Sequence, residues 1–131
     1  GAASNHKLNG CAEMQAASLL AKLESKDPTA MSARDTIQMA TLDGARALGL
    51  DHVTGSLEPG KSADFIALDF THLGMEPNHQ IESNLVYANL GSEVTWSWIA
   101  GKNVVKNRQL QTLDSDALHH KAAAWRGKLS P

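Results

Sequence analysis

Histidines are the first candidates for chemistry in this sequence, but their spacing does not assemble a metal site. The six are His6, His52, His72, His79, His119 and His120. Metal sites are often marked by H-x-H or H-E-x-x-H patterns, and neither pattern occurs here. The adjacent pair at 119 and 120 would point about 100° apart on a helix. We therefore predict surface histidines and assign no metal ligand or catalytic residue within this chain.

Nucleophile and phosphate-binding patterns are equally incomplete. Cys11 lies in an apolar helical pattern, which is typical of a small buried residue. Gly55 and Gly60 have the glycine spacing of a phosphate-binding loop, with Lys61 next. The residues that follow form a strand pattern, whereas a phosphate-binding loop must lead into a helix. We therefore interpret residues 55–61 as a turn that enters a strand.

Two further features have a structural interpretation and a functional one. Trp96 and Trp98 share one strand face, which favours a packed sheet surface over a platform for stacking ligands. Asp64 precedes a strand, where an aspartate more often fixes a turn than performs catalysis. By themselves, the residues of this chain therefore define no self-contained active site.

Composition limits the classes of protein to which the chain can belong. Its 131 residues suffice for one ordinary domain but are about half of the roughly 250 that a (β/α)8 barrel needs. Twelve basic and fourteen acidic residues give a net charge of −2, which indicates neither nucleic acid nor a membrane as partner. A single cysteine, no secretory signal and no long apolar run favour a soluble cytoplasmic protein.

Three helices are predicted from periodicity and caps. The first covers residues 8–23 and ends before Pro28. The second follows an N-cap at Ser32, carries a stripe of small apolar residues to Leu48, and ends with Gly49 in a left-handed conformation. The third begins at Asp114 or Ser115 and continues to residue 129.

Short strands are predicted in the second half of the chain. They cover residues 65–68, 94–98 and 104–105, and Gly101 supplies the turn of a hairpin between the last two. Residues 71–84 are irregular and have no functional interpretation, and 85–88 is an apolar run of uncertain type. These strands are too few for an independent sandwich, so we expect strands from outside this chain to complete it.

Three motifs in the right order resemble the amidohydrolase superfamily. The strongest is G-S-L-E-P-G-K-S-A-D-F-I at residues 55–66, which marks the return from a metal-dependent barrel to a small β-sandwich. M-A-T-L-D-G-A-R-A-L-G-L at residues 39–50 resembles the preceding helix, and W-I-A-G-K-N-V-V at 98–105 resembles the closing hairpin. The resemblance implies an α/β fold, namely the C-terminal part of a (β/α)8 barrel hydrolase plus C-terminal strands of its composite sandwich. Residues 1–52 would belong to the barrel domain and 53–131 to the sandwich domain with a terminal helix.

The first residues resemble one branch of that superfamily. G-A-A-S-N at residues 1–5 is similar to the end of the motif G-T-D-G-A-A-S-N in deaminases of 5-methylthioadenosine and S-adenosylhomocysteine. In that branch the aspartate before the glycine binds the metal and shuttles a proton, so the metal ligands would lie upstream of Gly1. Ser4 and Asn5 would lie in a substrate-binding loop, although capping of the next helix is an equal alternative. His6 departs from the commoner Asn or Asp, and its role is open.

The resemblance implies a specific reaction for the complete protein. A divalent metal, usually zinc, would activate a water that attacks C6 of an adenine ring, and ammonia would leave. The partners implied are a purine nucleoside or related heterocycle and the upstream part of the same protein, and a homo-oligomer is also open. The alternatives are a guanine-type deaminase or triazine hydrolase of the same superfamily, or a short non-catalytic binding or structural module. The absence of an initiator Met leads us to expect a fragment that is inactive alone.

Overall fold

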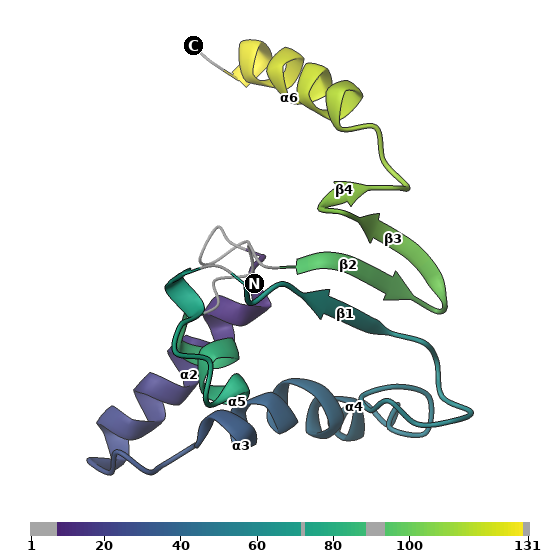
Figure 1. Ribbon diagram of the computed structural model, residues 1–131. Helices are drawn as coiled ribbons and strands as arrows, with labels where there is room; N and C mark the ends of the chain where they lie inside the picture. Colours follow the sequence, from purple (N-terminus) through teal and green to yellow (C-terminus); the bar gives the residue numbers. More distant parts are fainter. Residues whose placement is uncertain (1–7, 72, 89–93, 130–131) are drawn as a thin grey trace.

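A computed structural model describes residues 8–71, 73–88 and 94–129. Helices and a small sheet alternate along the chain, and the sheet lies between a helical layer and an isolated C-terminal helix (Figure 1). The elements in chain order are α2 (Gly10–Ser25), α3 (Ala33–Gln38), η1 (Met39–Asp43), α4 (Gly44–Ala47), β1 (Phe65–Leu68), η2 (Leu73–Met75), α5 (Ile81–Ser83), η3 (Asn84–Ala88), β2 (Val94–Ile99), β3 (Lys102–Lys106), β4 (Gln109–Leu110) and α6 (Ser115–Leu129).

Helix α2 confirms the first predicted helix to within two residues at each end. Asn9 is the N-cap, and its side-chain oxygen accepts a hydrogen bond from the backbone N–H of Ala12 at 3.1 Å. Lys26 ends the helix in the left-handed conformation, and its N–H bonds back to the carbonyl of Leu23.

The second predicted helix is also confirmed, with an unforeseen change of pitch at its centre. Ser32 caps it, and the reciprocal bond from its backbone N–H to the Asp35 carboxylate completes a capping box. The helix continues through α3, η1 and α4, and Gly49 follows with φ +69° as predicted. Segment η1 is a π-helix, in which each turn holds an extra residue. The sequence pattern assumed the α-helical period throughout.

The sheet is a four-stranded antiparallel meander in the order β1-β2-β3-β4. Phe65 pairs with Trp98, and Ala67 pairs with Trp96, so the predicted strands and their common face are confirmed. Ala100 and Gly101 both have positive φ in the β2–β3 turn, which is the geometry of a tight hairpin. Strand β4 was not predicted.

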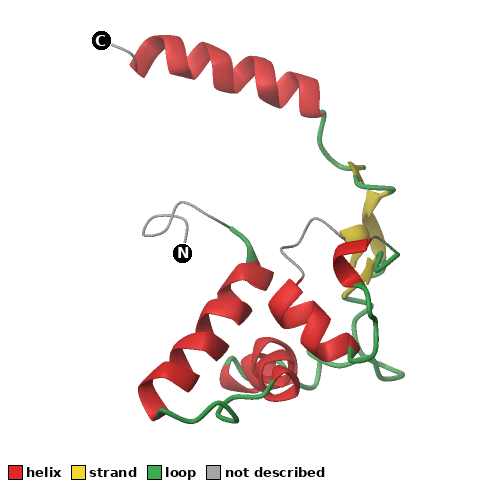
Figure 2. Cartoon of the chain, turned by 60° about the vertical axis from the view of Figure 1, so that its left-hand side comes forward, coloured by secondary structure: helices red, strands yellow, loops and turns green. Residues whose placement is uncertain are grey.

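The segment from residue 73 to residue 88 contains η2, α5 and η3, with irregular backbone at residues 76–80, and η3 packs on both α2 and α3 (Figure 2). It supplies Met75 and Val86, which are among the few buried apolar side chains of the described residues; the others are Ala33 and Ala45. The run at 85–88, whose type was uncertain, therefore forms the π-helical turn η3. Its environment explains this outcome, since the helix period places Val86 in a core that α2 and α3 create.

Helix α6 begins as predicted, with Asp114 accepting a hydrogen bond from the N–H of Ala117 at 3.0 Å. It extends away from the sheet and from the other helices (Figures 1 and 2). Its Leu118 and Trp125 are 45% and 54% exposed, so these large apolar side chains are not covered by the rest of the described residues.

Candidate functional site

The proposed substrate-binding residues Ser4 and Asn5, together with His6, lie outside the described residues. What the structure does define is the support that follows them, because Asn9 and helix α2 come directly after this segment in the chain. The candidate site is therefore built from the contacts that hold α2 in place.

Helix α2 is held by a half-buried polar cluster formed by Ser18, Lys22, Met31 and Tyr87. Ser18 is fully buried, and its hydroxyl donates to the carbonyl of Met31 at 2.8 Å. The Tyr87 hydroxyl lies 2.8 Å from the same Ser18 oxygen. Since the single Ser18 proton is already donated to a carbonyl, Tyr87 is the donor in this second bond.

Lys22 completes the cluster from one helical turn further along α2. Its ammonium donates to the Ser18 hydroxyl at 3.2 Å and to the carbonyls of Met31, at 2.8 Å, and Ala30. It also lies 5.8 Å from the centre of the Tyr87 ring. The Ser18 hydrogen bond and the nearby Lys22 charge lower the pKa of Tyr87 below its ordinary value, although burial opposes this.

A second contact joins the same two elements. The side-chain amide of Gln15 donates to the Tyr87 carbonyl at 2.7 Å. Tyr87 therefore binds α2 through both its backbone and its hydroxyl, at positions three residues apart on the helix. Sequence reasoning missed this cluster, because its partners are separated by about seventy residues and no motif connects them.

The motif at residues 55–66 has a structural role in this fold. The Lys61 ammonium donates to the Ser56 hydroxyl at 2.6 Å and to the Glu58 carboxylate at 3.2 Å. The segment then enters β1 and not a helix, which confirms the interpretation of a turn over a phosphate-binding loop. The Ser56 and Lys61 bonds lower the pKa of Glu58.

Asp64 fixes the end of this turn, as one of the two interpretations expected. Its carboxylate accepts a hydrogen bond from the backbone N–H of Ala100 at 2.6 Å and another from the Thr54 hydroxyl at 2.9 Å. These bonds lower its pKa. Asp64 therefore joins the turn to the β2–β3 hairpin.

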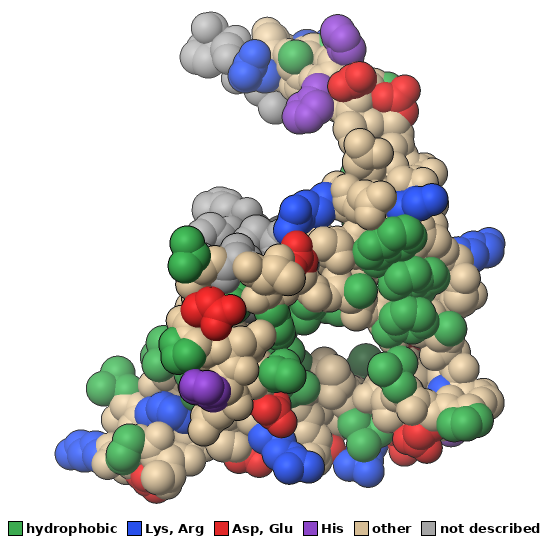
Figure 3. All heavy atoms as spheres, in the orientation of Figure 1, with side chains coloured by type: hydrophobic (Ala, Val, Ile, Leu, Met, Phe, Trp, Pro, Cys, Tyr) green, Lys and Arg blue, Asp and Glu red, His purple; other side chains and the backbone are tan. Residues whose placement is uncertain are grey.

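An apolar groove of about 590 Å³ is lined by the second helix, this turn and the start of β1. Its apolar lining includes Ala45 of α4, Leu48 just after α4, Leu57 of the turn and Phe65 of β1. Hydrophobic side chains also gather over the strands in the space-filling view (Figure 3). Phe65, Trp98 and Trp96 stack in a row with centroid separations of 4.5 and 5.6 Å, as a packed sheet face requires.

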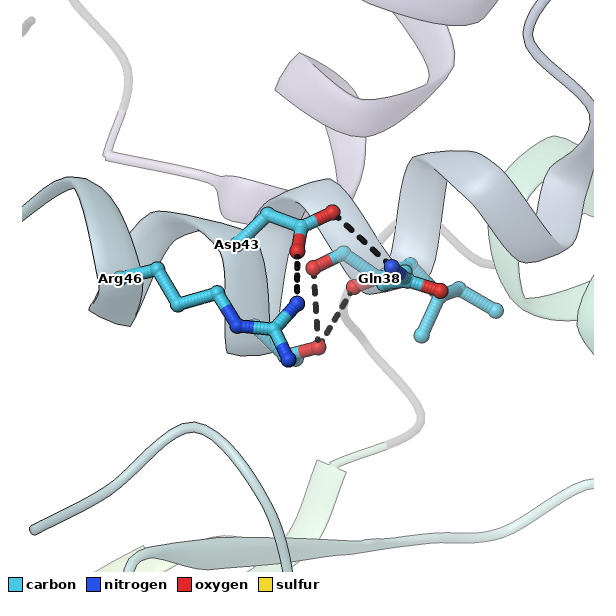
Figure 4. Close-up of polar contacts among 5 residues, drawn as sticks. Gln38, Asp43 and Arg46 are labelled. Atoms are coloured by element: carbon cyan, nitrogen blue, oxygen red, sulfur yellow. Dashed lines mark hydrogen bonds and ion pairs between the residues drawn. The ribbon is translucent and has the colours of Figure 1, made fainter. Parts of the chain in front are cut away.

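The outer side of the second helix is polar. Asp43, in the π-helical turn, accepts hydrogen bonds from Arg46 at 2.8 Å and from Gln38 at 3.1 Å (Figure 4). These side chains are exposed, and such contacts contribute only a few tenths of a kcal/mol each, on the order of 0.5. This surface stabilises the helix and offers no chemistry.

Within residues 8–71, 73–88 and 94–129, no three His, Cys, Asp or Glu side chains converge on a point that could hold a metal ion. The described histidines His52, His79, His119 and His120 are all exposed and lie on separate elements or, for the last two, on exposed α6. Cys11 is half-buried on α2. In the same residues, no helix is both long and apolar enough to cross a membrane.

Comparison with known proteins assigns this fold to a family. The model of the amidohydrolase family matches residues 1–104, and the chain belongs to this family. A 5-methylthioadenosine/S-adenosylhomocysteine deaminase from Teredinibacter turnerae is 48% identical over 129 residues, which are 98% of this chain and 29% of the relative.

Solved structures agree with this assignment. The crystal structure of an adenosine deaminase from Xanthomonas campestris with bound zinc superposes with a TM-score of 0.93 and 42% identity, over 98% of this chain and 29% of that one. The crystal structure of atrazine chlorohydrolase TrzN from Arthrobacter aurescens, complexed with zinc, superposes with a TM-score of 0.82 and 25% identity. This match covers 95% of this chain and 28% of that one. The chain thus spans less than a third of the relatives that it matches, and the predicted resemblance is confirmed.

Proposed function

We propose that this chain is part of a metal-dependent aminohydrolase that removes the exocyclic amine of an adenosine-type nucleoside. The observation that carries the proposal is the 48% identity to a 5-methylthioadenosine/S-adenosylhomocysteine deaminase over 98% of the chain. Water would replace the amine at C6 of the adenine ring, ammonia would be released, and an inosine-type nucleoside would result. The zinc-bound adenosine deaminase of the same fold supports the metal and the substrate class.

The described residues do not fit a zinc site, because no three potential ligands converge among them. The proposal therefore places the divalent metal, zinc by analogy with the relatives, on other residues of the complete protein. For this chain it assigns the support of the site and not its chemistry. Ser4 and Asn5 are proposed to contact the substrate just before helix α2 begins.

The proposal also includes the architecture. Residues 1–52 would complete a (β/α)8 barrel, and 53–131 would add strands and a terminal helix to a composite β-sandwich. The exposed apolar groove and the short antiparallel sheet support this view, since both leave hydrophobic surface that further strands could cover.

The test uses the natural full-length protein that carries this sequence. It is assayed with 5-methylthioadenosine, S-adenosylhomocysteine, adenosine, guanine and a chlorotriazine, and ammonia release is measured. We expect turnover of the adenosine-type compounds, loss of turnover on chelation and recovery with zinc. Turnover confined to guanine or the triazine would favour those hydrolases instead, and no turnover in the presence of any divalent metal would favour a non-catalytic module.

A further inference from the structure

Helix α6 (Ser115–Leu129) stands apart from the sheet and from the other helices (Figure 1). Each of residues 115–128 is exposed. A helix of about 15 residues without packing is only marginally stable in water, because most helical stability in proteins comes from a buried face. The Asp114 cap supports the first turn but does not supply such a face. Helix α6 therefore needs a surface that the described residues do not provide.

The sequence of α6 defines which of its faces is made for burial. Leu118, Ala122 and Trp125 follow the i, i+4, i+7 spacing and lie on one side of the helix, which we call the apolar stripe. Its two large side chains, Leu118 and Trp125, are 45% and 54% exposed. The opposite side holds Ala123 and Gly127, which offer little apolar surface. The apolar stripe is therefore the docking face.

Cationic side chains border the apolar stripe on both sides. The same helical geometry places Lys121 and Lys128 along one border and Arg126 along the other. The Lys128 ammonium lies 5.0 Å from the centre of the Trp125 ring. Asp116 is the one acidic residue in the sequence of this helix. A complementary surface is therefore apolar along its centre and carries carboxylates at its borders.

The size of the apolar stripe argues against a second copy as the partner. A tryptophan side chain buries about 150–250 Å². With one leucine and one alanine added, the apolar stripe stays well below the roughly 800 Å² per partner of a stable interface between proteins. A surface on the same polypeptide does not need this area, because the covalent link keeps the helix near it at a high effective concentration.

A solved relative supports the same partner. The zinc-bound adenosine deaminase superposes on 98% of this chain with a TM-score of 0.93, so the match includes α6 and its place beside the sheet. The match uses only 29% of that chain, which leaves most of that polypeptide to cover the helix. The amidohydrolase family model ends at residue 104, before α6 begins. Family membership by itself therefore assigns no role to this helix.

We propose that α6 docks through its apolar stripe onto an apolar surface, bordered by carboxylates, in a part of the complete protein that lies outside these 131 residues. This inference rests on the proposed function, in which the chain is part of a longer aminohydrolase. Only residues 111–114 separate α6 from β4, so the docked helix also holds the β4 edge of the sheet in place.

Trypsin cleavage of the natural full-length protein tests the docking. Lys121, Arg126 and Lys128 are cleavage sites within α6, and a docked helix must leave its partner before it is cut. The products are identified by mass as loss of a C-terminal peptide. We expect these sites to be cut at least tenfold more slowly than in a synthetic peptide of residues 111–131. Raising the salt concentration should reduce this protection relative to the peptide, because the bordering charges are screened.

Substitutions by glutamine test the docking face. Leu118→Gln and Trp125→Gln should each speed cleavage within α6 at least tenfold, because the undocked population increases when apolar burial is lost. Ala123→Gln is the matched control on the opposite side, and its cleavage rate should stay within about twofold of the wild type, since glutamine is a good helix former. Cleavage outside α6 should keep its wild-type rate in all three variants, which separates undocking from global unfolding.

Each contrary outcome removes a stated part of the proposal. Wild-type α6 cut as fast as the peptide overturns the docking, and so does Trp125→Gln cut no faster than Ala123→Gln. Protection that salt does not reduce overturns the carboxylate borders. Protection that is lost on dilution, together with a fall in mass in solution, overturns the assignment to the same polypeptide in favour of a second copy.

Deaminase activity measured on the same samples keeps this inference distinct from the proposed function, because cleavage requires no turnover. An inactive protein with a protected α6 overturns the proposed function alone. An active protein with an unprotected α6 overturns the docking alone.

Discussion

At the scale of single residues, Gly55 is the first residue of the 55–66 motif and lies in tight contact with the second helix. It has φ +91°, and a Cβ added there would lie 2.7 Å from the Cβ of Ala45 and 3.1 Å from the Cα of Leu42. The turn therefore approaches the second helix so closely that only hydrogen fits. The glycine is needed for both backbone conformation and space.

Replacing this glycine gives a prediction with an internal control. Gly60 has nearly the same φ, +92°, but a Cβ there would meet nothing within 4 Å. Gly60→Ala should therefore cost only the backbone strain, about 1–2 kcal/mol. Gly55→Ala should cost about 1–3 kcal/mol more because of overpacking. Denaturant unfolding of both variants of the full-length protein measures the difference, and equal losses would show that the close approach does not exist.

At the scale of elements, the sequence predicted those features whose conformation depends only on neighbouring residues. The sequence predicted the Ser32 N-cap, the left-handed Gly49 and the β2–β3 turn, because each depends only on residues next to it in the chain. The short helices η2, α5 and η3 were missed because their conformation depends on packing against α2 and α3, whereas residues 76–80 are irregular as predicted. The contact between Ser18 and Tyr87 could not be identified for the same reason, since the two residues are 69 positions apart in the sequence. Ser4 and Asn5 were proposed from a motif alone and lie outside the described residues.

Asp64 connects two elements, and this connection should depend on pH. Its folded-state pKa is lowered by the Ala100 N–H and the Thr54 hydroxyl, so its contribution to stability is fully present above its unfolded value of about 4 and is lost as pH falls through the folded value. In the full-length protein, the melting temperature of Asp64→Asn should therefore lie below that of the wild type at neutral pH, and the difference between the two should narrow below about pH 4.

The control for this comparison is Asp116→Asn, which removes a carboxylate from the exposed helix α6. Its melting temperature should remain close to that of the wild type at every pH. If the difference in melting temperature between Asp64→Asn and the wild type stayed constant below about pH 4, the carboxylate charge would have no part in joining the turn to the hairpin.

At the scale of the whole molecule, the balance of buried and exposed surface is unusual. Among the described residues only Ala33, Ala45, Met75 and Val86 form a buried apolar core. Eighteen large hydrophobic side chains of the same residues are exposed, including Leu23 at 74% and Trp125 at 54%. A stable domain of this length buries about two-thirds of the surface of its unfolded chain, with a core to match.

This balance predicts how the 131 residues behave when they are isolated. Cooperative unfolding requires a core whose loss exposes much apolar surface at once, and here much of that surface is already exposed. The isolated chain should therefore bind a hydrophobic dye strongly and melt over a broad range, whereas the full-length protein should bind little dye and melt sharply. A sharp transition without dye binding in the isolated chain would contradict this expectation. Its groove and helix α6 would then have to be covered by a second copy, which the mass in solution would reveal.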